Sequence, residues 1–264
     1  MQKLCCRIVF FVVLFFYLPL QSMAWGMLGH RVVGEIASSY LTSKTRTAIS
    51  KILGTESIAI ASNWADFIKS DTTYKYLNTW HYMNPDSGLN YSQLQAYLKA
   101  DTETDVYTKT NFIVKELKNK NLSKDKKVFY LRLLIHFIGD LHQPLHVSAK
   151  GSNGGNSIKV SWFNESSNLH RVWDEQLPES QKLSYTEYAN VINHTTPKQR
   201  LEWQQQPFSL WMYESYKISE RIHNDIKGSD KLSYNYNFKF VQTMNEQLLK
   251  GGVRLAGLLN EIFG

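Results

Sequence analysis

The sequence has little cysteine, little proline and only one long apolar run. Both cysteines, Cys5 and Cys6, fall within the first 24 residues, so the rest of the chain has neither a disulfide nor a thiolate metal ligand. Six prolines in 264 residues leave room for long helices. The absence of internal repeats, low-complexity tracts and long runs of one charge excludes a solenoid and a disordered tail.

The single apolar run stands at the N-terminus. Lys3 and Arg7 precede about 13 mostly apolar residues, and an A-x-A-like cleavage site ends at Ala24. A permanent membrane helix needs about 20 such residues, so an uncleaved anchor is the weaker alternative. We predict a cleaved secretory signal peptide over residues 1–24 and a secreted or periplasmic mature chain, residues 25–264, with no membrane association.

The mature chain has the size of one domain. It has 264 − 24 = 240 residues, enough to bury a core without covalent cross-links. Removing Lys3 and Arg7 lowers the formal net charge from +7 to +5. This mild basicity suits a polyanionic substrate but is also ordinary for a soluble protein. No linker divides the chain, so we expect a single domain. We also expect a monomer.

Apolar residues recur at helical spacing through most of the mature chain. In the segment that begins at Trp25, a helical face is formed by Val32, Val33, Ile36, Ala37 and Leu41. Further helical patterns cover residues 43–53, 57–70, 91–99, 105–119, 125–142, 168–177, 185–192, 207–227 and 235–262. The sequence predicts an all-α fold.

One segment, residues 145–163, departs from the helical pattern. Ile158, Val160 and Trp162 alternate with polar residues, which is typical of a strand. Gly154 and Gly155 stand before them, so we expect a short β-hairpin that turns through these glycines.

Histidine and aspartate recur at a spacing suited to metal binding. His136 and Asp140 lie one helical turn apart, and His146 follows just beyond the proline that ends their helix. The same His-x3-Asp spacing returns at His170 and Asp174. For the first of these pairs alone, a buried helix with a hydrogen-bonded histidine is an equally good interpretation. The repetition favours metal sites.

Three further candidates are His30, Asp66 and His81. In the absence of cysteine, these nitrogen and oxygen donors suit zinc. His142, His194 and His223 fall outside the patterns, and His142 points away from the face that His136 and Asp140 share.

The motifs together resemble those of the zinc-dependent, single-strand-specific nucleases of the S1/P1 type, which share a superfamily with bacterial phospholipase C. The matching motifs are WGMLGH at 25–30, WAD at 64–66, HY at 81–82, HFIGDLHQPLH at 136–146, GGN at 154–156 and HRVWD at 170–174. They keep the family's order over nearly the whole mature chain. The resemblance implies a helical phospholipase C/nuclease fold.

The resemblance also implies three zinc ions and their ligands. The first ion would be held by Asp66, His81, His136 and Asp140; the second by His146, His170 and Asp174; the third by His30, Asp140 and the α-amino and carbonyl groups of Trp25. Asp140 would then bridge two ions. The implied reaction is endonucleolytic hydrolysis of single-stranded DNA and RNA to 5′-phosphate products, with 3′-nucleotidase activity. Asp66, Asp140 and Lys69 would be catalytic, with Lys69 neutralising a phosphate oxygen.

Three residues resemble the family's substrate-binding positions. Tyr82 would stack on a base, and Asn84 and Asn156 would face its edge. The family commonly has Phe and Asp at the first two positions, so the base preference of this chain is open. A surface role for Lys69 and a structural turn role for Asn156 are the competing interpretations. Because eukaryotic members commonly have disulfides, we expect a bacterial protein.

Two other functions compete with a nuclease. A zinc-dependent phospholipase C uses nearly the same ligands, but that branch typically has Glu where this chain has Asp174, and an aromatic residue directly follows His81 here. A non-catalytic zinc protein would fill each ion's four positions with protein ligands, whereas the implied second ion has three. Both details favour a nuclease.

Overall fold

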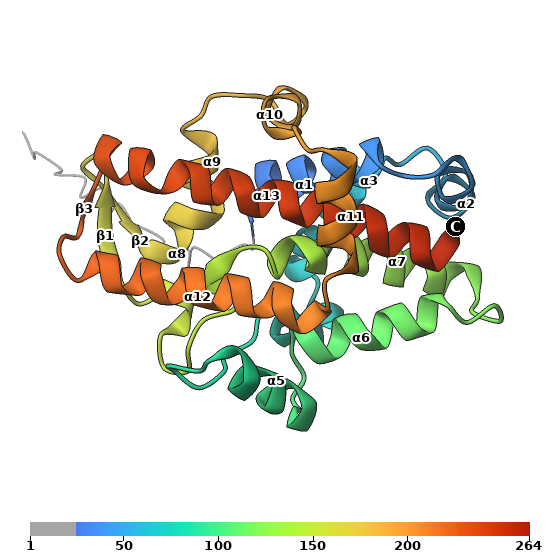
Figure 1. The fold of residues 1–264 in the computed structure, drawn as a ribbon, viewed down its shortest axis with the longest axis horizontal. Helices are drawn as coiled ribbons and strands as arrows, with labels where there is room; N and C mark the ends of the chain where they lie inside the picture. The colour runs from blue at the N-terminus through green and yellow to red at the C-terminus, as the bar shows by residue number, and fades with distance from the viewer. Residues whose placement is uncertain (1–24) are drawn as a thin grey trace, which may run out of the picture.

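A computed structural model describes residues 25–264, and the predicted signal peptide lies outside the described residues. The described chain is mainly helical with one small sheet at one end (Figure 1), which confirms the predicted fold class. Over residues 25–264, no helix is both long and apolar enough to cross a membrane.

The helices follow one another closely along the chain. The α-helices are α1 (Met27–Ser39), α2 (Ser43–Leu53), α3 (Ile58–Ala61), α4 (Trp64–Phe67), α5 (Tyr91–Ala100), α6 (Val106–Leu117), α7 (Lys124–Asp140), α8 (Leu169–Arg171), α9 (Leu177–Glu179), α10 (Tyr185–Ile192), α11 (Pro197–Gln205), α12 (Phe208–Ile226) and α13 (Tyr234–Phe263). The 3-10 segments are η1 (Ile68–Ser70), η2 (Thr72–His81), η3 (Pro144–His146) and η4 (Asn153–Gly155), and η5 (Val172–Gln176) is a π-helical turn. The strands are β1 (Lys159–Trp162), β2 (Glu165–Asn168) and β3 (Lys231–Leu232).

Helix α7 lies at the centre of the fold. It packs against α6, α13, α1 and α4, and its second half is buried from Leu133 through Asp140. This burial on all sides explains why the sequence there is nearly continuously apolar. His136 and Asp140 are the polar exceptions, so they are buried at the molecular centre.

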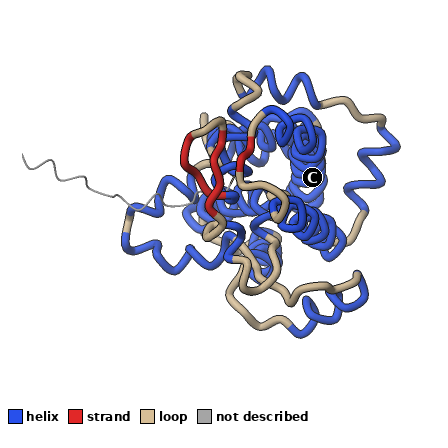
Figure 2. The backbone as a smooth tube through the Cα atoms, turned by 90° about the vertical axis from the view of Figure 1, so that its left-hand side faces the viewer, coloured by secondary structure: helices blue, strands red, loops and turns tan. Residues whose placement is uncertain are grey.

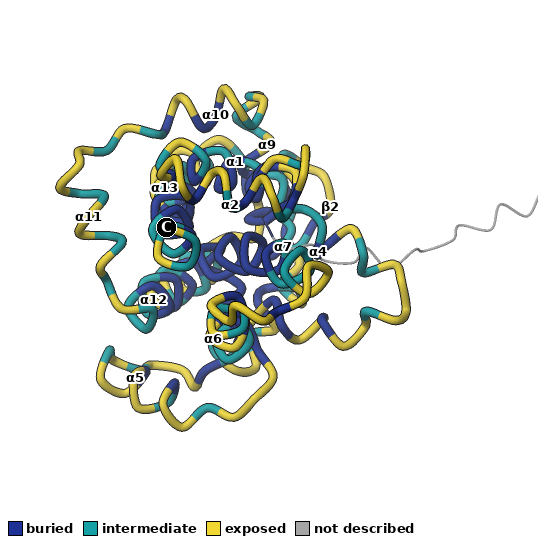
Figure 3. The backbone as a smooth tube through the Cα atoms, turned by 90° about the vertical axis from the view of Figure 1, so that its right-hand side faces the viewer, coloured by how far each residue is buried: buried dark blue, intermediate teal, exposed yellow. Residues whose placement is uncertain are grey.

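Helices α12 and α13 run antiparallel across the molecule, joined at the end where the sheet lies (Figure 1). Helix α1 packs along α13. Figure 3 shows the buried sides of α1, α7, α12 and α13 facing one another, while α10 and α11 form an outer, largely exposed arc. The long helices thus form a rigid frame around α7.

The sheet has the order β2-β1-β3, and its three strands lie side by side at one end of the molecule (Figure 2). Strands β1 and β2 form an antiparallel hairpin, with Lys159 opposite Asn168. The expected turn through Gly154 and Gly155 is wrong. The hairpin turns at Phe163 and Asn164, which have φ of 49° and 71°, as a two-residue turn between twisted strands requires.

Two predicted helices are also broken, and a residue at each break either contacts a candidate ligand or is one itself. The segment 57–70 divides into α3, α4 and η1, and at the end of α3 the carbonyl of Ser62 accepts a hydrogen bond from His136 Nδ1 at 2.6 Å. The segment 168–177 contains the π-helical turn η5, which carries Asp174. Such turns frequently occur at functional sites.

Candidate metal centre

Five histidines and three aspartates that are distant in the sequence meet beside the C-terminal half of α7. They are His30 on α1, Asp66 on α4, His81 at the end of η2, His136 and Asp140 on α7, His146 on η3, His170 on α8 and Asp174 on η5. Each is at most 6% exposed. Three groups among them place their ligand atoms within 4.8 Å of one another. Buried donors at this density are suited to metal ions.

The first group surrounds His136. Its Nε2 lies 3.0 Å from Nδ1 of His81 and 3.2 Å from Oδ2 of Asp140. Asp66 Oδ1 is 3.6 Å from the same nitrogen. The structure therefore brings together all four residues that the resemblance assigns to the first ion.

The second group contains His146, His170 and Asp174. His170 Nε2 lies 2.9 Å from Oδ2 of Asp174, and His146 Nε2 lies 3.8 Å from Oδ1. The π-helical turn presents the aspartate to both histidines. These are the residues assigned to the second ion.

Asp140 lies between the groups. Its Oδ2 faces His81 at 2.9 Å, while its Oδ1 lies 3.4 Å from His30 Nε2 and 3.7 Å from His146 Nδ1. One carboxylate thus faces histidines from separate elements. Its position suits a bridging ligand.

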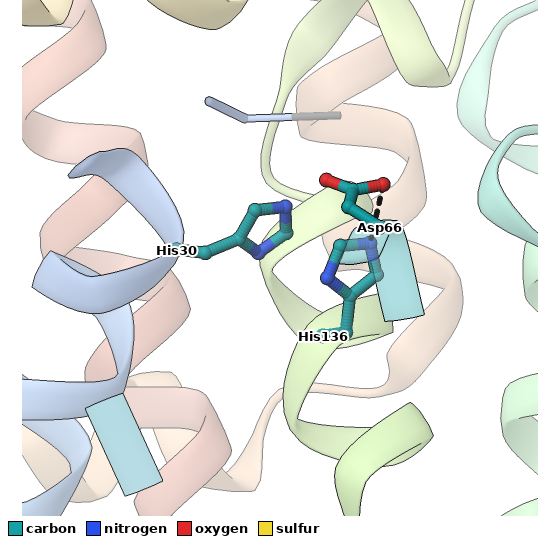
Figure 4. Close-up of side chains that lie close together, drawn as sticks. All are labelled: His30, Asp66 and His136. Carbon is teal, nitrogen blue, oxygen red and sulfur yellow. Dashed lines mark ion pairs between the residues drawn. The ribbon is translucent and has the colours of Figure 1, made fainter. Parts of the chain in front are cut away.

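His30 stacks on His136 with ring centroids 3.9 Å apart, and Figure 4 shows the two rings beside Asp66. Among the described residues, neither nitrogen of His30 has a hydrogen-bond partner. Gly139 makes room for this ring, since a Cβ there would lie 2.6 Å from His30 Nδ1. The unbonded, buried nitrogens are free to bind a metal.

Trp25 is fully buried just before α1. The amide of the next residue, Gly26, donates to the carbonyl of Asp174 at 2.6 Å. This bond fastens the start of the described chain beside the second group. Trp25 is the remaining residue of the implied third site.

Backbone carbonyls orient three of the histidine rings. In each case Nδ1 donates to a carbonyl oxygen, as the pairs His136–Ser62, His146–His81 and His170–Gly154 show at 2.6, 2.7 and 2.7 Å. Such a bond keeps the proton on Nδ1, so the lone pair of Nε2 faces the centre and can bind a metal ion. A Cβ on Gly154, whose φ is 55°, would lie 2.8 Å from the carbonyl of Leu145 and 3.2 Å from the His170 ring.

Gln143 is a residue that the sequence reasoning missed. Its side-chain amide donates to Asp174 Oδ1, and its side-chain oxygen accepts from the amide of Leu145 at 2.6 Å. It is completely buried. Its place between the proposed ligands Asp140 and His146 was the available signal, although position alone does not reveal where an amide side chain points.

Burial governs the protonation of the centre. Burial, followed by neighbouring positive groups, holds the pKa of His30, His81 and His146 well below the usual value. Burial also lowers the pKa of His136, but the carboxylates of Asp140 and Asp66 outweigh it and raise that pKa. Burial raises the pKa of Asp140 to about 6. The three neutral histidines are ready to act as metal donors without losing a proton.

A cleft with a volume of about 440 Å³ opens onto the centre. The histidines His81, His146 and His170 line it, as do all four predicted phosphate- and base-binding residues, Lys69, Tyr82, Asn84 and Asn156. Lys69 Nζ lies 2.5 Å from Asp66 Oδ1, and the side chain of Tyr82 is exposed. Asn156 donates to the carbonyl of Asn153 at 3.0 Å, which also gives it the predicted turn role.

The other three histidines lie outside the centre. His142 Nδ1 donates to the carbonyl of Ile138 at 2.7 Å, and Arg254 donates to its Nε2 at 3.0 Å. Lys75, Asn78 and Asn153 line the cleft but were not predicted, because nothing in their local sequence marks them.

The arrangement defines a mainly helical protein with a buried histidine–aspartate centre beside a polar cleft. The profile of the S1/P1 nuclease family matches residues 25–264, and the chain belongs to that family. It is therefore a metal-dependent, hydrolytic nuclease.

Individual relatives agree with this assignment. Endonuclease 3 of Arabidopsis thaliana is 30% identical over 92% of this chain and 90% of its own length. Nuclease S1 of Aspergillus oryzae is 28% identical over 91% of this chain and 92% of its own. Nuclease P1 of Penicillium citrinum is 26% identical over 91% of this chain and 98% of its own length.

Among solved structures, the alpha toxin from Clostridium absonum superposes with a TM-score of 0.45 and 16% identity. The superposition covers 90% of this chain and 64% of the toxin chain. A likeness of this size supports no functional conclusion.

Proposed function

We propose that this protein is a secreted or periplasmic, trinuclear zinc endonuclease that hydrolyses single-stranded DNA and RNA to 5′-phosphate products and also acts on 3′-nucleotides. One observation carries the proposal. Eight buried histidine and aspartate side chains converge, and three of the histidines line a cleft whose wall carries a lysine and an exposed tyrosine. A structural metal site alone requires neither the cleft nor those two side chains.

The donor set fits zinc. Zinc binds imidazole nitrogens and carboxylate oxygens, so it needs no thiolate here. Backbone carbonyls fix the tautomers of three of the histidines. The ligands would be divided as the resemblance implies: Asp66, His81, His136 and Asp140; His146, His170 and Asp174; and Trp25, His30 and Asp140. When bound, zinc supplies Lewis acidity that lowers the pKa of water to about 7 and stabilises negative charge on oxygen.

Lys69 and Asp66 act together on the phosphate. Their ion pair holds the ammonium group at the cleft wall, 14% exposed, beside the centre. A lysine held in this way neutralises negative charge that develops on a phosphate oxygen. Asp66 thus positions Lys69 as well as serving as a ligand.

Tyr82 supplies the stacking surface for a base. It is 41% exposed and borders the cleft together with Asn84. Stacking accepts every base, which suits a nuclease that acts on varied sequences. The amide of Asn84 can both donate to and accept from a base edge, so it does not restrict the base as a carboxylate would.

The deciding experiment combines zinc analysis of the mature protein with hydrolysis of single-stranded DNA, duplex DNA and phosphatidylcholine vesicles. We expect three zinc ions per chain, rapid cleavage of the single strand, slow cleavage of the duplex and no release of phosphocholine. Cleavage of the vesicles in preference to DNA would assign the protein to the phospholipase alternative. Fewer than three ions in a fully active protein would contradict the trinuclear centre.

A further inference from the structure

Aromatic rings and a lysine continue from the rim of the cleft onto its outer surface. In the 3-10 helix η2, residues three apart share a face, so Lys75, Asn78 and His81 all face the cleft. Tyr76 follows Lys75 directly and is 53% exposed on the neighbouring face. It therefore lies immediately beside a lysine that lines the cleft.

The rings beyond Tyr76 form a connected series. Tyr76 contacts Trp80 edge-on, with centroids 5.6 Å apart. The ammonium group of Lys109 on α6 lies 4.8 Å from the Trp80 ring centroid and 5.8 Å from that of Phe112. Phe112 is 41% exposed. Helix α6 packs on η2, so these side chains lie on adjoining elements.

We propose that Tyr76, Lys109 and Phe112, connected by the buried Trp80 ring, form an aromatic–lysine strip outside the cleft. The strip would bind the phosphodiester backbone and bases of a single nucleic-acid strand. The strip rests on the proposed function, since it extends the same substrate's path. Exposed rings offer stacking surfaces for any base, and lysines that lie among them pair with phosphates. The combination is characteristic of sequence-tolerant single-strand binding.

The charges around the cleft support this route. A neighbouring hollow shares Tyr82, Asn84 and Asn153 with the cleft, but three carboxyl groups line it against one lysine, Lys150. Those carboxyl groups belong to Asp86, Glu103 and Asp105. A phosphate backbone is disfavoured there and favoured beside Lys75 and Lys109.

The test compares a dinucleotide with a 20-nucleotide single strand. Tyr76→Ala should raise KM for the long strand about fivefold or more, the lower end of what one stacked base contributes, and leave the dinucleotide unaffected. Tyr76→Phe should retain the wild-type values. Lys109→Ala should reduce the slope of log KM against log salt by about 0.7 for the long strand, the value for one phosphate contact.

Matched controls come from the other end of the molecule, at the start of α13 (Figure 1). Phe238 is 88% exposed, and Lys239 lies over the Phe240 ring at 5.6 Å. Phe238→Ala and Lys239→Ala should change neither substrate's KM. Equal effects on both substrate lengths, or no effect of Tyr76→Ala on the long strand, would overturn the proposal.

Binding is measured separately by fluorescence anisotropy of a labelled 20-nucleotide strand in the Asp140→Asn background, so that the strand is not consumed. Tyr76→Ala should weaken binding about fivefold there as well. If the wild-type chain cleaves nothing while Tyr76 still governs strand binding, the proposed hydrolysis is wrong and the strip stands. Unaltered binding contradicts the strip whatever the hydrolysis assays give.

Discussion

Asp140 is the side chain at which the histidines of the centre meet, because its two oxygens face His30, His81 and His146 at 2.9 to 3.7 Å. Asp174 faces the two histidines of its own group. We expect Asp140→Asn to lower kcat/KM on single-stranded DNA more than Asp174→Asn, and to lose more zinc by mass spectrometry. Equal residual rates with all zinc retained would argue against a bridging role.

At this scale helical spacing predicted the pairs His136–Asp140 and His170–Asp174, because histidine and aspartate four apart on a helix share a face. The family resemblance implied the remaining members of the centre. Neither predicted what orients them. The carbonyl of Ser62 and the amide of Gln143 act through contacts between distant segments. Local sequence holds no signal for a carbonyl acceptor, since every residue has one.

At the scale of single elements, α7 has a glycine, Gly139, where a side chain would collide with the His30 ring. Replacing a helical glycine with alanine ordinarily stabilises a helix by about 1 kcal/mol. In Gly139→Ala the new Cβ would instead lie 2.6 Å from His30 Nδ1, so the His30 ring must move. We expect lower zinc content and at least tenfold lower activity while the helical circular dichroism is retained. Full activity in this variant would show that His30 is not needed in its present position.

Helix α6 gives a pH-dependent prediction. Burial, followed by the neighbouring Asp101, raises the pKa of its N-cap, Asp105, to about 7 from an unfolded value near 3.8. The folded state therefore holds that proton more tightly, and the resulting stabilisation is present below pH 4 and lost as the pH rises to 7. Asparagine caps equally well and does not ionise.

Asp105→Asn should thus gain stability over the wild type as the pH rises from 5 to 8, by on the order of 1 kcal/mol. Urea unfolding midpoints at the two pH values measure this gain. Parallel pH profiles for the two proteins would mean that Asp105 is not abnormally protonated in the folded state.

The helices were predicted well where apolar residues recur at helical spacing. The predicted segments 43–53 and 185–192 coincide with α2 and α10. The hairpin turn was misplaced because Gly154-Gly155 is the stronger local signal, whereas Phe163 and Asn164 adopt positive φ under the constraint of strand pairing. The 3-10 helix η2 was not predicted because its form depends on packing against α6 and α7.

At the scale of the whole molecule, the centre joins segments from His30 to Asp174 in a chain that has no cysteine after residue 24. Removing the metal with a chelator should lower the unfolding free energy by about 2.7 kcal/mol for each site held at 100 times its dissociation constant. A reducing agent should shift nothing. An unchanged thermal midpoint after complete zinc removal would show that the helices hold the centre without the ions.

The N-terminus provides a second molecular prediction. Because Gly26 fastens the start of the described chain to Asp174, a free α-amino group on Trp25 would arise beside the centre. In a longer chain that nitrogen is an amide, whose delocalised lone pair binds metal poorly. A protein beginning at Trp25 should bind three zinc ions, and one beginning with an added Met before Trp25 should bind two and lose activity. Identical zinc content and rates would remove Trp25 from the ligand set.

The modest size of the cleft limits how a double helix can reach the metal centre. Its volume of about 440 Å³ is that of a small-molecule pocket, and its reactive floor is almost fully buried. A nucleotide in a stacked pair cannot reach that floor until it leaves its partner, at a cost of a few kcal/mol. The rate on duplex DNA should therefore follow how often each pair opens spontaneously. Frayed ends, mismatches and A·T-rich stretches would be cut first. The relative cleavage rates along a duplex would therefore measure how readily each part of it melts.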